Sequence, residues 1–190
     1  DLNGDGRADL VVGNVSGQLF AFLNTGTGFQ LTPGLLPADL GFAGAAPTFV
    51  DLDGDGDQDL VLGAQGGGLR YYEATEAGFV ERSGAANPVE GVTVLGYTVP
   101  RFHDIDGDGD LDIVLGDYFG GLATYENRDG AFVRLEGAEN PFAFVPGQAL
   151  SSDLMYSAPE FVDLDEDGDL DLLVGFYGGQ LMAWQRQADG

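Results

Sequence analysis

Apolar residues along the chain come in short runs that are bounded by Gly, Asn and Asp. Many of these residues are β-branched or aromatic, as in LVLG (60–63), LRYYE (69–73) and FVER (79–82). Runs of this kind predict short β-strands separated by tight turns. No window of helical length sustains a 3.6-residue apolar period, so the pattern predicts an all-β chain.

The runs recur in a repeat. Four segments align without gaps, each an acidic loop followed by an apolar run: DLNGDGRADLVVG from Asp1, DLDGDGDQDLVLG from Asp51, DIDGDGDLDIVLG from Asp104 and DLDEDGDLDLLVG from Asp163. An interval of about 50 residues is that of one propeller blade or one solenoid coil. We therefore interpret the chain as a single repeat domain, with approximate repeats at residues 1–46, 47–99, 100–158 and 159–190.

Each repeat predicts four strands. Strand a is a Pro-x-Phe-x-Asp approach to the acidic loop, strand b the apolar run after it, strand c a Leu-to-aromatic stretch, and strand d follows a Gly turn. Both faces of strand b are apolar, which suits a sheet packed between other sheets. Four-stranded antiparallel sheets at this interval predict a β-propeller of about four repeats. The aromatics of strand c recur at one place and are expected to pack between blades: Phe22, Tyr72, Tyr125 and Trp184.

The chain begins after strand a of the first repeat and ends after strand c of the fourth. Three arrangements fit this pattern: part of a larger propeller, a small four-bladed ring, or a ring closed by oligomerisation. An open propeller would leave strand edges exposed, which proteins avoid. The sequence leaves these alternatives open.

The acidic loops have the spacing of a calcium site. Carboxylates or amides occupy loop positions 1, 3, 5 and 9, and position 7 offers its backbone carbonyl. This alternation lets a chain wrap oxygens around one ion, and calcium takes six to eight oxygens in a flexible geometry, whereas magnesium needs a tighter octahedron. Position 12 is Val or Leu where an EF-hand has Glu, and strands replace the flanking helices, so the Asp at position 9 is expected to close each site.

We therefore expect about four calcium ions, one in each loop. The first site comprises Asp1, Asn3, Asp5, Arg7 through its carbonyl, and Asp9. The other three comprise Asp51, Asp53, Asp55, Asp57 and Asp59; Asp104, Asp106, Asp108, Asp110 and Asp112; and Asp163, Asp165, Asp167, Asp169 and Asp171. The first site should bind most weakly, since Asn3 lowers its charge and strand a is absent. Solvated Asp-Gly turns are the alternative, but four copies in register and the repulsion among their carboxylates favour calcium.

Composition limits the partners. The 190 residues include 32 acidic residues and 7 basic ones, for a net charge of -25. Such a field repels phosphate backbones and anionic membrane surfaces, so nucleic-acid binding and membrane insertion are not expected. No apolar run approaches the length of about 18 residues that a membrane span needs. The chain has no Cys, which excludes disulfides, thiolate metal sites and cysteine nucleophiles.

No catalytic constellation stands out. His103 is the single His and takes the place that Val50 and Val162 take in the sister repeats, so we expect it to pack. It has no repeated Ser partner of the kind that nucleophilic catalysis uses. Asp117, Asp153 and Glu160 lie outside the loops, so a glycosidase pair stays an alternative. Arg101 and Glu160 occupy matching positions of strand a and are candidates for an ion pair lining the channel.

The long connections between repeats are the expected ligand face. In a blade the acidic loops lie at one end, so the d–a connections (residues 32–46, 83–99 and 136–158) and the b–c turns lie at the other. Long loops on a rigid scaffold are the usual place for binding. Two b–c turns are aromatic, Tyr118-Phe119 and Phe176-Tyr177, and are candidates for stacking on sugars or anchoring a protein. The alternative is that these rings cover neighbouring blades.

The motif DLDGDGDQDLVLG, with the Gly-x-Leu and aromatic that follow it, resembles the FG-GAP/VCBS repeats, which are related to the integrin α-subunit propeller. The Pro-x-Phe and Asn-Pro features are similar to the bacterial VCBS-type versions, and the resemblance covers nearly the whole chain. It implies calcium loops in propeller blades, usually about six to eight of them.

The same resemblance implies an extracellular or cell-surface protein. We expect a recognition or adhesion module with structural calcium and a protein or glycan ligand. The alternatives are an assembly unit joining chains through unpaired end strands, and an accessory or catalytic domain of a secreted polysaccharide-active enzyme.

Overall fold

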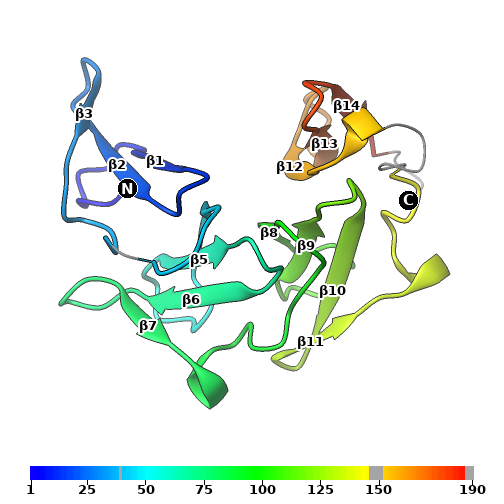
Figure 1. Ribbon diagram of the computed structural model, residues 1–190, viewed down its shortest axis with the longest axis horizontal. Helices are drawn as coiled ribbons and strands as arrows, with labels where there is room; N and C mark the ends of the chain where they lie inside the picture. Colours follow the sequence, from blue (N-terminus) through cyan, green and yellow to red (C-terminus); the bar gives the residue numbers. More distant parts are fainter. Residues whose placement is uncertain (39, 146–151, 187–190) are drawn as a thin grey trace.

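The computed structural model describes residues 1–38, 40–145 and 152–186. The strands form four antiparallel sheets, which follow one another along an arc (Figure 1). The first sheet contains β1 (Leu10–Gly13), β2 (Leu19–Asn24) and β3 (Phe29–Leu31). The second contains β4 (Ala46–Val50), β5 (Asp59–Gly63), β6 (Leu69–Glu73) and β7 (Val80–Arg82).

The third and fourth sheets repeat this plan. The third contains β8 (Val99–His103), β9 (Asp112–Gly116), β10 (Leu122–Arg128) and β11 (Ala131–Arg134). The fourth contains β12 (Ala158–Val162), β13 (Asp171–Gly175) and β14 (Leu181–Trp184). Short 3₁₀ turns interrupt the connections: η1 (Gly84–Ala86), η2 (Gly137–Glu139) and η4 (Ser152–Leu154). No helix among the described residues has the length and apolar character needed to cross a membrane.

Strand order within every sheet is the order of the chain, so each strand pairs with its sequence neighbours. The second and third sheets contain all four predicted strands, a to d. The first sheet contains strands b to d, and the fourth contains strands a to c. The predictions of an all-β chain and of a four-stranded antiparallel unit are therefore confirmed.

Strand b is the buried strand of each complete sheet. Every residue of β5 and of β9 is buried, and their central residues are fully inaccessible: Leu60, Val61, Leu62, Ile113, Val114 and Leu115, all at 0% exposure. Burying a side chain of this size stabilises a fold by about 1.5–3 kcal/mol. The strands are apolar on both faces because neighbouring sheets cover both faces, as the sequence predicts.

Three apolar clusters lie between consecutive sheets. Leu60 and Tyr72 belong to the cluster between the first and second sheets, and Tyr71 and Ile113 to the cluster between the second and third. Val174 belongs to the cluster between the third and fourth sheets. Three of the four strand-c aromatics contribute as predicted: Tyr72 and Tyr125 are buried, and Trp184 packs against the last cluster. Phe22 is half-buried and belongs to none of the three clusters.

The turns lie at two opposite ends of the sheets. The b–c turns bind the connections that follow strand d: Ala45 N–H donates to the carbonyl of Asn14 at 3.0 Å, and Val94 N–H to that of Gly67 at 2.8 Å. This confirms that the b–c turns and the d–a connections share one end. Residue 39 and residues 146–151 of those connections lie outside the described residues.

Candidate metal loops and aromatic surface

The aspartate at loop position 9 connects the acidic loop to the end of strand c through hydrogen bonds. It is buried in three sheets, where Asp59, Asp112 and Asp171 are 0%, 2% and 1% exposed. One carboxylate oxygen accepts a hydrogen bond from the backbone N–H at loop position 2, and the other from a backbone N–H fifteen residues further on, at or just after the end of strand c. The donors at position 2 are Leu2, Leu52, Ile105 and Leu164, at 2.7, 3.1, 2.9 and 2.9 Å. The donors at or just after the end of strand c are Asn24, Ala74, Asn127 and Arg186, at 2.7, 2.9, 2.8 and 2.8 Å.

The sequence predicts this aspartate only as a metal ligand, whereas the contacts make it also the residue that joins the acidic loop to the far end of strand c. In the first sheet these hydrogen bonds also change the pKa of the aspartate. The N–H groups of Asn24 and Leu2 lower the pKa of Asp9 by stabilising its charged form.

The aspartate at position 1 shapes the loop around itself. Its second oxygen accepts the N–H of the glycine at position 6: Gly6, Gly56, Gly109 and Gly168, at 2.6, 3.0, 3.0 and 3.1 Å. Position 4 of the loop has a left-handed backbone, which Gly adopts easily. In the fourth loop that position is Glu166, with φ 63°.

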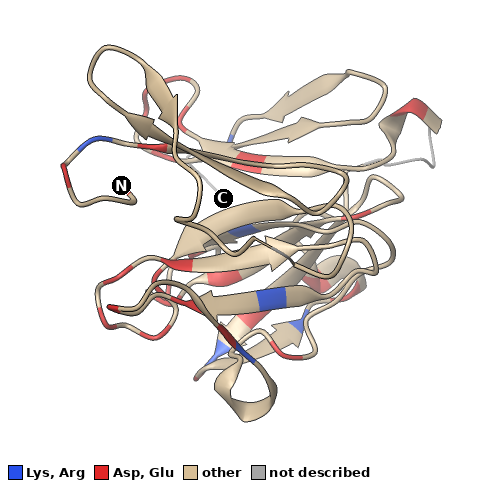
Figure 2. Ribbon diagram, turned by 60° about the vertical axis from the view of Figure 1, so that its left-hand side comes forward, with Lys and Arg blue, Asp and Glu red and all other residues tan. Residues whose placement is uncertain are grey.

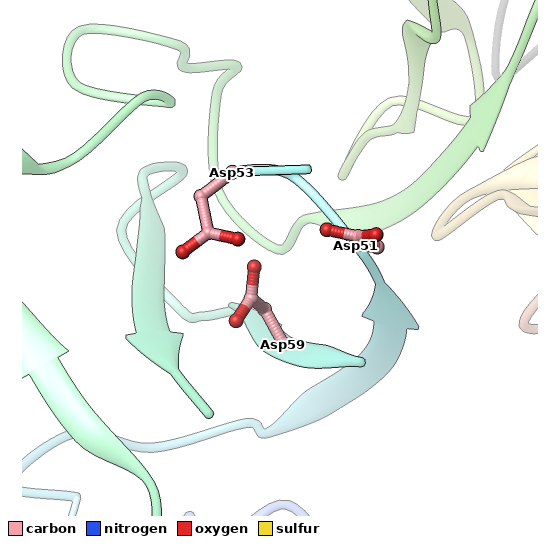
Figure 3. Close-up of side chains that lie close together, drawn as sticks. All are labelled: Asp51, Asp53 and Asp59. Atoms are coloured by element: carbon pink, nitrogen blue, oxygen red, sulfur yellow. The ribbon is translucent and has the colours of Figure 1, made fainter. Parts of the chain in front are cut away.

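Three of the four loops gather carboxylates into a cluster. The groups are Asp51, Asp53 and Asp59; Asp104, Asp106 and Asp108; and Asp163, Asp165 and Asp171. In each group one oxygen per residue lies within 4.8 Å of the others. In Figure 3 the carboxylates of Asp51, Asp53 and Asp59 point toward a common space. Calcium binds oxygen at about 2.3–2.6 Å, so oxygens on opposite sides of one ion lie about 5 Å apart. The donor set and its spacing therefore fit a calcium ion.

Desolvation and repulsion within the clusters raise the pKa of two of their carboxyl groups, Asp53 and Asp165. The N–H of Asp55 lowers the pKa of Asp53, but desolvation and the negative charges of Asp59 and Asp55 outweigh it, and the net shift is upward. Desolvation, then the charges of Asp167 and Asp171, raise the pKa of Asp165. A cation placed among these groups would remove that unfavourable energy.

The clusters use fewer side chains than the sequence predicts. The cluster of the third loop holds the carboxylates of positions 1, 3 and 5 and leaves out Asp112, whose pKa burial raises. The clusters of the second and fourth loops leave out position 5, and the side chains at position 7 belong to no cluster. In every loop the position 5 carboxylate accepts the N–H of position 7. These donors are Arg7, Asp57, Asp110 and Asp169, at 3.0, 2.8, 2.9 and 2.9 Å.

The first loop differs from the others. Among the described residues, no group of three acidic or histidine side chains gathers there. The Arg7 guanidinium forms an ion pair with Asp5, and its Nε donates to the carbonyl of Asn24 at 2.6 Å. The amide of Asn3 donates to the same Asp5 at 3.1 Å. An internal cation thus already compensates the carboxylate at position 5, which supports weaker binding there for a reason that sequence reasoning missed.

The predicted aromatic ligand residues divide into two kinds. Tyr177 is 78% exposed and Phe119 is 38% exposed. Phe176 is only 7% exposed, since it packs in the cluster between the third and fourth sheets. Its assignment to a ligand face is therefore wrong: it is a core residue.

Two further tyrosines join Tyr118 and Tyr177, and sequence reasoning missed both. Tyr97 and Tyr156 precede strand a in the connections, each three residues before its proline, and this common register was the available signal. The ring of Tyr156 lies 5.3 Å from Tyr97, 4.8 Å from Tyr118 and 5.5 Å from Tyr177, between centroids. We call these four residues the tyrosine cluster.

Comparison with protein families identifies the repeat. The FG-GAP-like repeat matches residues 1–62 and 104–174, which together make up most of the chain. The chain belongs to the FG-GAP-like repeat family. No curated protein matches this FG-GAP-like chain.

The FG-GAP-like chain is similar in fold to a solved structure described as the structural basis of specific recognition of non-reducing terminal N-acetylglucosamine by an Agrocybe aegerita lectin. The TM-score is 0.50 at 19% identity, over 97% of this chain and 50% of the lectin chain. The FG-GAP-like chain therefore spans about half the length of that lectin, and at this identity the likeness concerns the fold alone.

The remaining candidate residues of the FG-GAP-like chain have structural contacts. His103 stacks on Phe161 at 5.2 Å, which agrees with the packing role predicted for it. Arg101 pairs with Glu160 at 2.9 Å, and both line a cavity of about 590 Å³ beside β4 and β8. Asp117 accepts the N–H of Gly121 at 2.9 Å within a b–c turn, and burial raises its pKa.

Proposed function

We propose that this FG-GAP-like chain is a calcium-stabilised β-propeller module that recognises a glycan outside the cell or at its surface. The observation that carries the proposal is the recurrence of a cluster of three carboxylates, in the acidic loop that precedes strand b, in three successive sheets.

Calcium has a structural role in this proposal. The residues that would hold it are those of the three clusters, together with the backbone carbonyl at position 7. A bound ion would supply positive charge among the carboxylates. That charge would hold the acidic loop against strand b, which follows the loop. Extracellular calcium modules bind at about 10⁻⁴–10⁻³ M. Loops that are exposed and highly charged suit a compartment where calcium is abundant.

The blade interpretation draws on the order of strands and on packing. Each sheet is an antiparallel meander, and the first strands of successive sheets contact one another, β4 with β8 and β8 with β12. In Figure 2 many of the acidic residues, in red, lie in the loops at one end of the sheets. That leaves the opposite end, with its long connections, for recognition.

A glycan is the favoured ligand for two reasons. The lectin of similar fold is described as recognising N-acetylglucosamine, and exposed aromatic rings lie at the end opposite the acidic loops. The net charge of -25 disfavours anionic partners such as nucleic acids. Adhesion to a protein partner stays the alternative, since an exposed aromatic surface serves both.

The test is a glycan array probed with the labelled chain, in calcium and again in EDTA, alongside calorimetric titration of calcium into the apo protein. We expect calcium uptake and glycan binding that EDTA weakens. Absence of heat on calcium addition would contradict the structural role of calcium. Calcium uptake without binding to any neutral glycan would contradict glycan recognition and leave a protein ligand.

A further inference from the structure

We propose that the tyrosine cluster, Tyr97, Tyr118, Tyr156 and Tyr177, is the surface on which a neutral pyranose binds. The inference rests on the proposed glycan recognition and adds where the sugar binds and which sugars are excluded. The four residues come from two b–c turns and two connections, in the third and fourth repeats.

Tyr156 is the centre of the cluster. It lies within 5.5 Å of the three other tyrosine rings, at interplanar angles of 43° to 67°. Desolvation, followed by the neighbouring tyrosines Tyr118, Tyr97 and Tyr177, raises the pKa of its hydroxyl. Phe119 extends the surface, edge-on to Tyr118 at 5.2 Å. The rings are thus held by one another at fixed angles rather than projecting singly into solvent.

The backbone beneath the rings is also fixed. Tyr156 N–H donates to the Tyr118 carbonyl at 3.1 Å, and Tyr177 N–H donates to the Met155 carbonyl at 2.9 Å. Tyr156 has φ 53°, a left-handed conformation that is rare for a bulky residue and persists only where its surroundings impose it.

Two glycines make room for the cluster. A Cβ on Gly44 would come within 2.2 Å of the Tyr97 ring, and a Cβ on Gly96 within 2.5 Å of the Tyr118 Cβ. Both glycines also have positive φ, 74° and 86°. Tyr97 and Tyr118 therefore occupy space that is free only because the neighbouring residues are glycines. This indicates a built packing arrangement rather than a chance grouping of exposed rings.

The chemistry of the cluster matches an uncharged sugar. A pyranose presents C–H groups on its faces and hydroxyls at its edge, and tyrosine offers an aromatic face with a hydroxyl at its tip. Tyr177, at 78% exposure, leaves a ring face accessible. Carboxylated sugars are disfavoured, because six arginines are already paired with acids: Arg7, Arg70, Arg82, Arg101, Arg128 and Arg134.

The experiment measures binding of two oligosaccharides by calorimetry in calcium. One is a neutral N-acetylglucosamine oligomer and the other an oligogalacturonate of similar length. Tyr177→Ala is the principal variant, because an exposed side chain can be removed without unfolding. Val15→Ala is its matched control: Val15 follows strand b in the first repeat at the position that Tyr177 has in the fourth, and it is 75% exposed.

We expect the neutral oligomer to bind the wild type, the Tyr177→Ala variant to lose about tenfold in affinity, and the Val15→Ala variant to stay within about twofold. Tyr156→Phe, which keeps the ring, should lose less than Tyr156→Ala. If the Tyr177→Ala and Tyr156→Ala variants both bind the neutral oligomer with wild-type affinity, the sugar does not bind at the tyrosine cluster, although glycan recognition itself still holds. Stronger binding of oligogalacturonate would overturn the neutral-sugar assignment, and no binding of either sugar by the wild type would overturn the proposed function itself.

Discussion

The Tyr71 hydroxyl donates a hydrogen bond to the Asp59 carboxylate at 2.8 Å, and the two side chains are 1% and 0% exposed. The same oxygen accepts the Leu52 N–H at 3.1 Å, and the other oxygen accepts the Ala74 N–H at 2.9 Å. In the sister repeats the place of Tyr71 is taken by Ala21, Thr124 and Ala183. The second sheet therefore has a side-chain donor to its buried aspartate where the others have small residues.

Tyr71→Phe should destabilise the fold by about 1.5–3 kcal/mol, the range for a hydrogen bond to a charged group, because Asp59 stays buried with one donor fewer. Urea unfolding at fixed calcium concentration measures the change. Tyr125→Phe is the comparison, since the Tyr125 hydroxyl contacts only neutral groups: it donates to the Thr93 carbonyl at 2.6 Å and accepts the Thr93 N–H at 3.1 Å. Each of these two neutral hydrogen bonds should contribute about 0.5–1.5 kcal/mol. A loss in Tyr71→Phe no larger than the loss per hydrogen bond in Tyr125→Phe would mean that the charge on Asp59 contributes nothing.

Calcium removal should lower the melting temperature. An ion that binds only the folded state adds about 2.7 kcal/mol at a hundredfold excess over its Kd. For a chain of this size each kcal/mol corresponds to roughly 2–4 °C. Chelation with EDTA, followed by circular dichroism on heating, should therefore lower the midpoint by several degrees for each site emptied. If the midpoint is unchanged and elemental analysis finds no calcium in the dialysed protein, the loops are solvated acidic turns rather than calcium sites.

The first loop should be the weakest calcium site, because Arg7 already pairs with Asp5. The double change Asn3→Asp and Arg7→Asp gives this loop the acidic pattern of the second loop. Calorimetric titration should then find one more tight site than in the wild type. The converse change, Asp53→Asn with Asp57→Arg, should remove one tight site. If the first double variant gains no site, the flanking structure rather than the loop sequence limits binding there.

The sequence predicts the repeat, its four strands and the two ends of the sheets because each rests on a local pattern. Acidic spacing also locates the carboxylates that meet in three loops. What it misses depends on contacts between repeats. Phe176 and Tyr177 are adjacent and both aromatic, and only the packing of the third sheet against the fourth buries one of them and exposes the other. Tyr156 becomes the centre of a cluster only when two connections and two turns meet, which no single motif encodes.

A glycine at the end of strand b lets the next sheet approach closely. In the first three sheets a Cβ at this position would lie within about 2 Å of the backbone carbonyl oxygen that directly precedes strand a of the next sheet. These pairs are Gly13 with Ala45, Gly63 with Thr98 and Gly116 with Ser157, at 2.0, 2.0 and 2.1 Å. Gly175 holds the same place in the fourth sheet, and a Cβ there would meet only the Leu181 side chain, at 3.8 Å.

Gly63→Ala and Gly175→Ala are therefore the same substitution at the same place in a strand, in two different surroundings. The first forces a methyl group against the Thr98 carbonyl, which no rotamer change relieves, so we expect a loss of about 3 kcal/mol or more, at the upper end of overpacking costs. The second should change stability by less than about 0.5 kcal/mol. Urea midpoints of the two variants, measured in the same calcium buffer, give the comparison. Equal effects would mean that the second and third sheets are not held at this distance in solution, because the clash at Gly63 exists only when they are.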